Sequence, residues 1–253
     1  MDAREGKPRT AGRDGAHRVT RAVILAAGRG ARLAPLTDRV PKPLVPVNGV
    51  PIIATILDAL HAAGISSITI VRGYCGAAFD TLREEYPHLT FLDNPDWERA
   101  NNISSIALAG RAGLLADSYV IEGDLYLANP AIVTSTQERT NYIAFPVEAT
   151  DDWCFDVDAA GKITHIDTAS DHPCRQMLGL SYWTAQDGAR LAACANALYA
   201  EECYHQLYWD EIALKYYLPE FSIHIRACRR EDVWEIDTVE ELRALEERMK
   251  YMC

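Results

Sequence analysis

Short apolar runs alternate with amphipathic segments along the first half of the chain. Residues 21–27 read RAVILAA and end at Gly28, a pattern typical of a parallel strand that is buried on both faces. In residues 52–63 the apolar positions recur at helical spacing before Gly64, which predicts a helix with a glycine stop. The alternation continues with predicted strands at 66–73, 89–94 and 118–127 and predicted helices near 77–86 and 102–114. We therefore expect an α/β fold of the Rossmann-like kind, with a mostly parallel sheet and crossover helices.

The second half of the chain has shorter predicted strands with turns between them. Strands are expected at 141–149, 154–167, 177–184 and 221–228, and helices near 185–200, 209–217 and 238–250. No internal repeat or low-complexity linker separates the two halves. We predict a flexible N-terminal arm at 1–20 and a single domain at 21–253. Within that domain, a parallel half at 21–130 precedes a mixed-strand lobe at 131–253 that covers the carboxyl edge of the sheet.

Composition narrows the class of protein. The chain has 253 residues, of which 49% are hydrophobic and 24% charged, values that suit one globular domain with a buried core. No apolar stretch approaches the roughly 20 residues of a membrane span, and the N-terminal segment lacks the apolar region of a secretory signal. The seven cysteines contain no C-x-x-C pair, which disfavours a disulfide framework or a zinc site and favours the cytoplasm.

The charge is distributed unevenly. Residues 1–48 carry ten Lys and Arg against four Asp and Glu, whereas the rest of the chain carries fifteen against thirty-two. Such an acidic body disfavours nucleic acid as a partner. Acidic groups near a basic loop would instead suit a phosphate that is bridged by a metal ion.

The segment LAAGRGARLAPLTDRVPKPL at 25–44 is that basic loop. Gly28 and Gly30 would let the backbone approach a ligand and aim N–H groups at it, while Arg32 and Lys42 would neutralise phosphate oxygens. Position 33 is leucine, so the dinucleotide fingerprint is absent, and no G-K-[ST] of a P-loop occurs. We predict that the loop binds nucleotide phosphates through Leu25, Ala26, Ala27, Gly28 and Gly30.

Carboxylates follow a predicted strand in the segment VIEGDLYL. Glu122 and Asp124 are spaced to face the same side of that strand, and Mg²⁺ prefers such hard oxygen ligands. Two segments could supply a further acid, LYWDE with Asp210 and VWEID with Glu235 and Asp237.

Aromatic residues lie beside acids repeatedly in the second half, as in the pairs Asp152–Trp153, Trp209–Asp210 and Trp234–Glu235. A trimethylammonium group cannot donate an ordinary N–H hydrogen bond, so proteins hold it with aromatic faces and nearby anions. The lobe therefore fits a ligand that carries an organic cation.

The basic loop carries a resemblance to a known family. The string L-x-A-G-x-G-x-R-L-x-P-L-T-x-x-x-P-K-P-L is similar to the signature of nucleotidyltransferases that join a nucleoside triphosphate to a phosphorylated small molecule. The later pieces NPDWERANNISSIAL, DDWCFDVD, MLGLSYW, LYWDEIAL and WEIDTVEELRALEE extend the similarity over roughly 22–250. Their order resembles that in bacterial CTP:phosphocholine cytidylyltransferases, a branch of the sugar-phosphate and MobA-like nucleotidyltransferase superfamily. The resemblance implies a GT-A-like fold whose first half binds CTP and whose second half binds the acceptor.

The resemblance also implies roles for individual residues. Arg32 and Lys42 would be catalytic, and Asp124 and Asp210 would hold Mg²⁺. The nucleotide pocket would include Asn101, Asn102, Ser104 and Glu122, and the acceptor pocket would include Trp153, Tyr182, Tyr208, Glu235 and Asp237. Relatives often carry a second Asp at the position of Glu122, so the role of this residue stays open.

We therefore predict a cytidylyltransferase that transfers CMP from CTP to a small amine-bearing phosphate, phosphocholine in the first place, with CDP-choline and pyrophosphate as products. Phosphoethanolamine and 2-aminoethylphosphonate remain alternatives, because a primary ammonium would suit the same acids. A sugar-1-phosphate nucleotidyltransferase fits the aromatic, acidic lobe less well, and a non-catalytic nucleotide sensor does not require the lysine and metal acids that are present. The enzyme is expected to be cytoplasmic, monomeric or homodimeric, with neither nucleic acid nor membrane as a partner.

Overall fold

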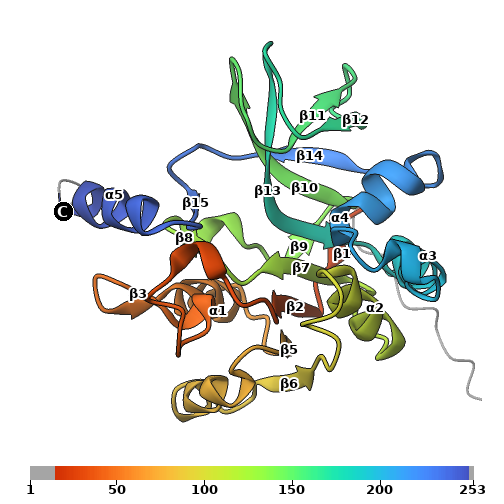
Figure 1. Ribbon diagram of the computed structural model, residues 1–253. Coiled ribbons are helices and arrows are strands. Elements are labelled where there is room, and N and C mark those ends of the chain that lie inside the picture. Colours follow the sequence, from red (N-terminus) through yellow and green to blue (C-terminus); the bar gives the residue numbers. More distant parts are fainter. Residues whose placement is uncertain (1–14, 251–253) are drawn as a thin grey trace, which may run out of the picture.

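A computed structural model describes residues 15–250 of the chain. Its main sheet has nine strands (Figure 1). In the first half of the chain, β2 (Arg21–Ala26) pairs in parallel with β5 (Ile68–Arg72) and with β7 (Ser118–Glu122), and β5 pairs in parallel with β6 (Thr90–Asp93). The predicted parallel half is therefore confirmed.

Helices cover both faces of these parallel strands. The helix α1 (Ile52–Ala62) lies on one side of the sheet, and α2 (Ile103–Arg111) and α3 (Ala185–Tyr199) lie on the other (Figure 1). Alternate residues of β2 face opposite cores, with Ile24 packed in the core of α1 and Val23 in the core of α2 and α3. This double burial is the reason that the strand reads as a continuous apolar run. Gly64 ends α1 in a left-handed conformation, with a φ of 73°.

The second half adds mixed strands to the same sheet. The long strand β13 (Cys174–Trp183) pairs antiparallel with β7, with β10 (Asn141–Val147) and with β11 (Cys154–Val157). Strand β11 pairs with β12 (Ile163–Asp167), and β10 pairs in parallel with β14 (His224–Ala227). One sheet thus runs from the nucleotide-binding half predicted at 21–130 into the predicted lobe.

The predicted strand at 118–127 is broken in two. Gly123 separates β7 from β8 (Leu125–Leu127), and β8 pairs antiparallel with β15 (Val233–Glu235), a strand that the sequence pattern did not predict. The Gly123 N–H donates to the carbonyl of Leu25, and a Cβ at this glycine would lie 3.0 Å from that oxygen. The close approach to β2 turns the chain and directs Asp124 toward the carboxyl end of the sheet.

Two predicted helices differ in their geometry. The segment near 77–86 is a 3₁₀ helix at Gly76–Glu84, and the one at 209–217 is a short α4 (Trp209–Glu211) that continues as a π-helix at Ile212–Tyr216. The remaining 3₁₀ turns are Ala31–Leu33, Lys42–Leu44, Pro130–Ile132, Glu202–Tyr204 and Leu218–Glu220.

The C-terminal helix α5 (Val239–Met249) begins with a capping box formed by Thr238 and Glu241. Its apolar side packs in a separate small core together with the hairpin of β3 (Pro46–Val47) and β4 (Val50–Pro51) and with part of the basic loop. The members of this core are Leu33, Val45, Val47, Ile52, Tyr126, Ile236, Leu242 and Leu245. The helix α5 therefore packs against both the basic loop and the segment that follows β15.

The predicted boundary of the N-terminal arm at residue 20 is wrong. His17–Arg18 form β1, which pairs with β9 (Thr136–Gln137), and the adjacent Val19 is buried with its N–H bonded to the carbonyl of Ser135. Residues 1–14 of the predicted arm, and 251–253, lie outside the described residues. None of the helices in 15–250 combines the length and the apolar composition of a membrane span.

Candidate active site

A cleft of about 420 Å³ opens at the carboxyl ends of β2 and β7, between the parallel half and the lobe. This is the edge of a parallel sheet at which ligands bind in open α/β folds. The cleft brings together every predicted site residue except Tyr182. They are Leu25, Ala26, Ala27, Gly28, Gly30, Arg32, Lys42, Asn101, Asn102, Ser104, Glu122, Asp124, Trp153, Tyr208, Asp210, Glu235 and Asp237.

The acceptor-binding role predicted for Tyr182 is wrong. The side chain is fully buried in the core of α1, where its hydroxyl donates to Asp117 at 3.1 Å and its ring meets Tyr119 edge-on. Successive residues of a strand point to opposite faces, so the position of Tyr182 on β13 turns its ring away from the cleft.

The basic loop is folded tightly at Gly30. This residue has a φ of 63°, and a Cβ there would lie 2.7 Å from the Cβ of Lys42. The hydroxyl of Thr37 donates to the Gly30 carbonyl at 2.9 Å, and Leu33 is buried beneath the loop. Glycine at this position therefore lets Lys42 pass close to the backbone and reach the cleft.

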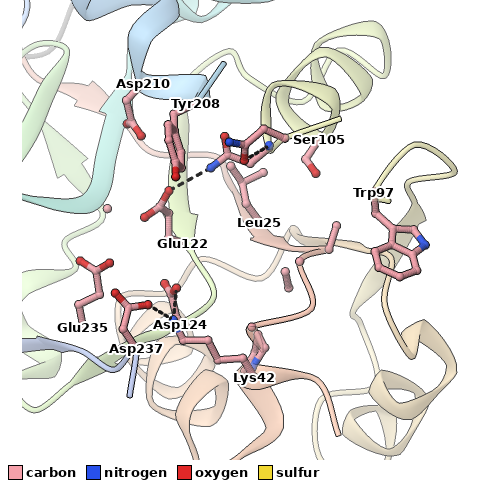
Figure 2. Close-up of a pocket in the computed structure, with 18 of the residues that line it drawn as sticks. Leu25, Lys42, Trp97, Ser105, Glu122, Asp124, Tyr208, Asp210, Glu235 and Asp237 are labelled. Atoms are coloured by element: carbon pink, nitrogen blue, oxygen red, sulfur yellow. Dashed lines mark hydrogen bonds and ion pairs between the residues drawn. The ribbon is translucent and has the colours of Figure 1, made fainter. Parts of the chain in front are cut away.

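Lys42 is a buried cation between two carboxylates (Figure 2). Its Nζ lies 2.7 Å from Oδ2 of Asp124 and 2.5 Å from Oδ1 of Asp237. Burial alone would lower the pKa of Lys42, but the two carboxylates more than offset it and raise the pKa to about 12. The exposed Arg32 also contacts Oδ1 of Asp237, at 2.9 Å. Two cations thus converge on the acids of this part of the cleft.

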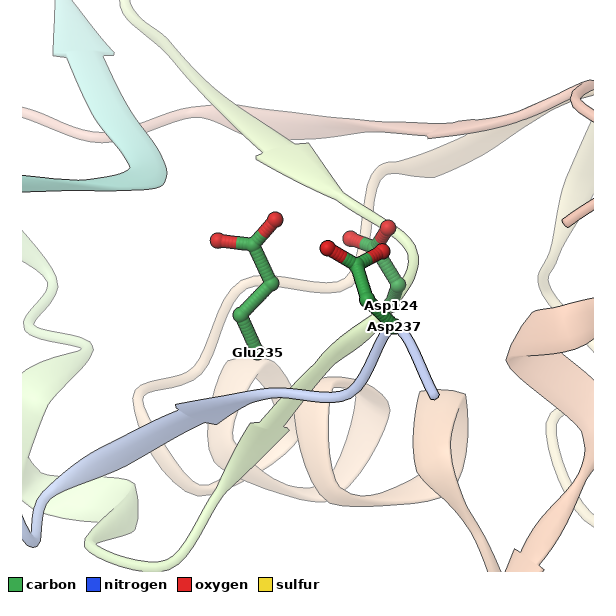
Figure 3. Close-up of side chains that lie close together, drawn as sticks. All are labelled: Asp124, Glu235 and Asp237. Carbon is green, nitrogen blue, oxygen red and sulfur yellow. The ribbon is translucent and has the colours of Figure 1, made fainter. Parts of the chain in front are cut away.

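Three carboxylates form a candidate metal centre (Figure 3). Asp124, Glu235 and Asp237 each offer one oxygen, and these oxygens all lie within 4.8 Å of one another. The pairing of β8 with β15 places them together, since Glu235 is opposite Leu125 in the register. Burial, followed by the charges of Asp124 and Asp237, raises the pKa of Glu235 to about 8.

The donor set fits a divalent cation. Oδ1 of Asp124 is buried and has no hydrogen-bond partner within the described part of the chain, and a buried acceptor of this kind calls for a partner. Carboxylate oxygens are the ligands that Mg²⁺ takes from proteins, usually one or two at a time.

Asp210, predicted to hold the metal together with Asp124, is not one of the three clustered acids. Its carboxylate is buried and accepts a hydrogen bond from the hydroxyl of Tyr142 at 2.9 Å. Burial raises the pKa of Asp210 to about 7, although the bond from Tyr142 opposes the shift. The fold therefore brings Asp237, rather than Asp210, into the group that contains Asp124.

Glu122 lies deeper in the cleft, between these two groups of acids (Figure 2). Its Oε1 accepts from Nε1 of Trp209 at 3.1 Å and from the amide of Asn102 at 3.4 Å. A Cβ at Gly179 would lie 2.3 Å from Oε2 of Glu122, so this glycine makes room for the carboxylate. Burial and the charge of Asp210 raise the pKa of Glu122 well above its ordinary value.

The lobe contributes two aromatic residues to the cleft, Trp153 and Tyr208, which we call the aromatic corner. The rings of Trp153 and Tyr208 meet edge to face, with centroids 5.9 Å apart. Tyr208 is 49% exposed. Asp152 lines the cleft beside them, and its carboxylate accepts from the Trp153 N–H at 2.7 Å. The two aromatic residues and the two acids Asp152 and Glu235 thus all line the cleft.

The sequence interpretation missed several cleft residues, among them Asn94, Trp97, Ser105, Met177 and Gly179. A signal existed for the first two, because the segment NPDW directly follows the strand β6, whose carboxyl end must lie at the same edge as that of β2. No local pattern distinguishes Met177 or Gly179 from other strand residues.

The fold and the cleft define a nucleotidyltransferase. Residues 22–206 match the family model described as the MobA-like NTP transferase domain, and the chain belongs to that family. Members of the family generally use a divalent metal.

Individual relatives are similar along nearly the whole chain. A 2-aminoethylphosphonate cytidylyltransferase from Lancefieldella rimae is 36% identical over 92% of this chain and 94% of its own length. A choline-phosphate cytidylyltransferase from Streptococcus pneumoniae is 32% identical over 91% of this chain and 98% of its own. A solved structure of the CTP:phosphocholine cytidylyltransferase from Streptococcus pneumoniae has a TM-score of 0.85, with 32% identity, and covers 92% of this chain and 100% of that one.

Proposed function

We propose that the protein transfers CMP from CTP to phosphocholine and forms CDP-choline and pyrophosphate. The observation that carries this proposal is the corner of Trp153 and Tyr208, bordered by Asp152 and Glu235, in the same cleft as the basic glycine loop. Aromatic faces with nearby carboxylates suit a quaternary ammonium. The similarity to choline-phosphate cytidylyltransferases along nearly the whole chain supports the same acceptor.

The nucleotide would lie with its phosphates along the basic loop. The backbone at Gly28 and Gly30 borders the cleft without side chains in the way, and Lys42 and Arg32 offer positive charge beside it. A loop of this kind after a parallel strand is suited to an anionic ligand.

We propose Mg²⁺ as the metal, held by Asp124 and Asp237, with Glu235 beside them. When bound, the ion would supply positive charge to the triphosphate. The Lys42 ammonium group would then be released from its two carboxylates and could contact a phosphate oxygen instead. The positive charge of Lys42 would thus stay inside the cleft.

The transfer itself requires positioning more than proton chemistry. A phosphate oxygen of the acceptor is already anionic at neutral pH, so no strong general base is needed. It would attack the α-phosphorus in line, and the new P–O bond would form as the bond to the bridging oxygen of pyrophosphate breaks. Lys42 and Arg32 would reduce the repulsion between the two anions, and the aromatic corner would hold the acceptor in place.

A second acceptor, 2-aminoethylphosphonate, is favoured by one specific observation. The relative from Lancefieldella rimae bears that activity in its name and shares 36% of its residues with this chain. The acids Asp152 and Glu235 could also receive the N–H groups of a primary ammonium. In that case the carboxylates, rather than the rings, would determine specificity.

We assign the enzyme to the cytoplasm, where CTP and phosphorylated amines would be its partners. The absence of any C-x-x-C pair among seven cysteines supports a reducing compartment.

The test is pyrophosphate release with CTP and Mg²⁺, measured against phosphocholine, phosphoethanolamine, 2-aminoethylphosphonate and glucose-1-phosphate. The proposal predicts the highest kcat/KM with phosphocholine. A preference for 2-aminoethylphosphonate would favour the second acceptor, and turnover of glucose-1-phosphate alone would contradict both.

Two exposed tyrosines provide a matched pair of variants. Tyr208 lines the cleft, whereas Tyr216 is similarly exposed, at 42%, but lies outside it. We expect Tyr208→Leu to raise the KM for phosphocholine about tenfold, since it removes one aromatic face, and Tyr216→Leu to leave the KM unchanged. Equal effects of the two substitutions would show that the corner does not bind the acceptor.

A further inference from the structure

A tyrosine next to the cleft holds the basic loop at two points. The N–H of Tyr74, two residues after β5, donates to the carbonyl of Ala27 at 3.0 Å. The phenol oxygen of Tyr74 lies 2.9 Å from the carbonyl oxygen of Thr37 and 2.8 Å from that of Asp38. Because neither carbonyl can donate, the hydroxyl proton is shared between these two acceptors. The backbone and the side chain of one residue thus bind both ends of the segment 27–38.

The outer part of the loop depends on this hydroxyl. The two bonds to Tyr74 are the only hydrogen bonds in the described chain that join residues 34–40 to a segment outside the basic loop. Leu36, at the turn of this segment, has an exposed side chain that does not anchor it. Loss of the hydroxyl would therefore leave the outer part of the loop without a hydrogen bond to the rest of the protein.

A further hydrogen bond connects Tyr74 with the part of the loop that lines the cleft. The side chain of Thr37 is buried, and its hydroxyl donates to the carbonyl of Gly30 at 2.9 Å. Gly30 lies against Lys42, and Arg32 follows two residues later in the chain. All three residues line the cleft, whereas Tyr74 does not. Tyr74 can therefore act on the cleft through Thr37.

The ring of Tyr74 has contacts that do not involve its hydroxyl. It meets the ring of Trp97 edge-on, with centroids 5.6 Å apart, and the guanidinium of Arg29 lies 5.8 Å from its centroid. Gly73 makes this packing possible, since a Cβ there would lie 2.6 Å from the Trp97 side chain and 2.8 Å from the carbonyl oxygen of Ala27. Phenylalanine at position 74 would keep the ring contacts and lose only the hydroxyl.

We propose that Tyr74 is a positioning residue for the nucleotide phosphates. Its hydroxyl holds the basic loop in the shape in which the Gly30 backbone and the Arg32 side chain border the cleft. This inference rests on the proposed function, in which the phosphates lie along this loop. A loop that is ordered before binding loses less conformational entropy when the ligand arrives. The effect of removing the hydroxyl should therefore fall on the nucleotide and not on the acceptor.

The experiment measures the KM of Tyr74→Phe for each substrate, at a saturating concentration of the other. We expect the KM for CTP to rise about threefold to tenfold, the usual effect of losing one hydrogen bond, and the KM for phosphocholine to stay unchanged. The inhibition constant of inorganic pyrophosphate should rise together with the KM for CTP. A merely structural role would lower kcat or the unfolding temperature and leave these constants unaltered. That result, or an equal rise of both KM values, would overturn the inference.

Tyr86→Phe is the matched control. Tyr86 is buried in the core of α1, and its hydroxyl donates to the carboxylate of Asp58 at 2.8 Å. The substitution removes one tyrosine hydroxyl and one hydrogen bond away from the basic loop. The KM for CTP should stay at the level of the unmodified enzyme, even if the unfolding temperature falls. A rise as large as that in Tyr74→Phe would show that the effect is not specific to the loop.

Thr37→Val tests the path from Tyr74 to Gly30. We expect this substitution also to raise the KM for CTP, because it removes the bond to the Gly30 carbonyl. Two substitutions along one path have a combined effect smaller than the product of their separate effects, so the double variant should resemble the more severe single one. A combined effect equal to the product would contradict the path. Thermal unfolding shows whether each variant folds, and Tyr74→Phe alone decides the matter if Thr37→Val does not.

Two results separate this inference from the proposed function. If the unmodified enzyme uses CTP and Tyr74→Phe keeps the same KM for it, the inference is overturned and the proposed function stands. If the unmodified enzyme uses another nucleoside triphosphate in place of CTP, the proposed function is overturned. The KM for that nucleotide then decides the role of Tyr74, because all these nucleotides share the triphosphate group.

Discussion

At the scale of single residues, Lys42 connects the phosphate loop with the metal centre. Its ammonium group contacts both Asp124 and Asp237, which are two of the three acids that could hold a cation. A divalent ion and this ammonium cannot share the same carboxylate oxygens without repulsion. The lysine therefore stabilises the metal-free protein and should compete with the metal until a phosphate is present to receive it.

Lys42→Met tests this competition. In the absence of nucleotide, the affinity for Mn²⁺ should rise, because the two carboxylates lose their cation, and isothermal titration would measure the change. Turnover should fall by roughly 10²- to 10³-fold, the usual effect of removing one group that stabilises transition-state charge.

Lys215→Met is the control for this substitution. Lys215 pairs with Glu211 at 3.1 Å, and its side chain is 60% exposed. Both metal affinity and turnover should stay at the level of the unmodified protein. Equal Mn²⁺ affinity in the Lys42 variant and the control would contradict the competition.

At the scale of elements, the sequence predicted what depends on long periodic patterns. The apolar run of β2 and the helical spacing of α1 are confirmed, because β2 is buried along nearly all of its length and α1 buries one face against the sheet. The break at Gly123 could not be predicted, since it arises from a contact with the carbonyl of Leu25, about a hundred residues earlier in the chain. Strand β15 has three residues and forms only by pairing with β8, so no local signal marks it.

Contacts between distant parts of the chain also decide which acids form the metal centre. The sequence identified Asp124, Asp210, Glu235 and Asp237 as the relevant carboxylates, and all four line the cleft. Which of them meet is decided by the pairing of β8 and β15, and this pairing groups Asp124 with Glu235 and Asp237. Tyr182, in contrast, was predicted to line the cleft and does not. The direction of its side chain depends on the register of β13 in the sheet, which its neighbours in the sequence do not reveal.

The helix α5 offers a test at this scale. Leu245 is 1% exposed in the small core that also contains Leu33 of the basic loop and Ile236 next to the metal acids. We expect Leu245→Ala to lower the free energy of unfolding by about 2–5 kcal/mol, measured in urea, and to weaken metal binding. Leu36→Ala, at a position 43% exposed, should change the free energy by less than about 0.5 kcal/mol. A loss of stability with unaltered metal affinity would show that α5 does not position the acids.

At the scale of the whole molecule, the cleft depends on both halves of the chain. The parallel half supplies the basic loop, Asn94 and Ser105, whereas the lobe supplies Trp153 and Tyr208. The cleft also gathers buried acids from both halves, among them Glu122 and Asp210. In the absence of a bound cation, this concentration of carboxylates opposes folding when the acids are ionised.

The stability of the metal-free protein should therefore fall as the pH rises. The pKa of Asp210 increases from 3.8 to about 7 on folding, and that of Glu235 from 4.5 to about 8. Between these values the folded chain binds more protons than the unfolded chain, so the free energy of unfolding decreases with pH from about 4 to about 8. The raised pKa of Lys42 also contributes to the free energy of unfolding. This contribution does not offset the trend, because it is lost only as the pH approaches about 12.

Urea denaturation with a chelator at several values between pH 5 and pH 8.5 would measure the trend. Asp210→Asn should make the decrease with pH less steep, since the amide does not titrate, and the remaining decrease would come from the other acids, Glu235 among them. A free energy of unfolding that rises over this range would contradict the assignment of protonated acids in the cleft.

The acceptor preference of the enzyme is tested most directly by a competition in one tube. The purified protein would receive CTP, Mg²⁺ and equal concentrations of phosphocholine, phosphoethanolamine and 2-aminoethylphosphonate, and mass spectrometry would identify the products. We expect CDP-choline as the main product, with one pyrophosphate formed for each CMP transferred. A mixture without CDP-choline would contradict phosphocholine as the acceptor, and pyrophosphate release without any CMP conjugate would contradict the transfer of CMP.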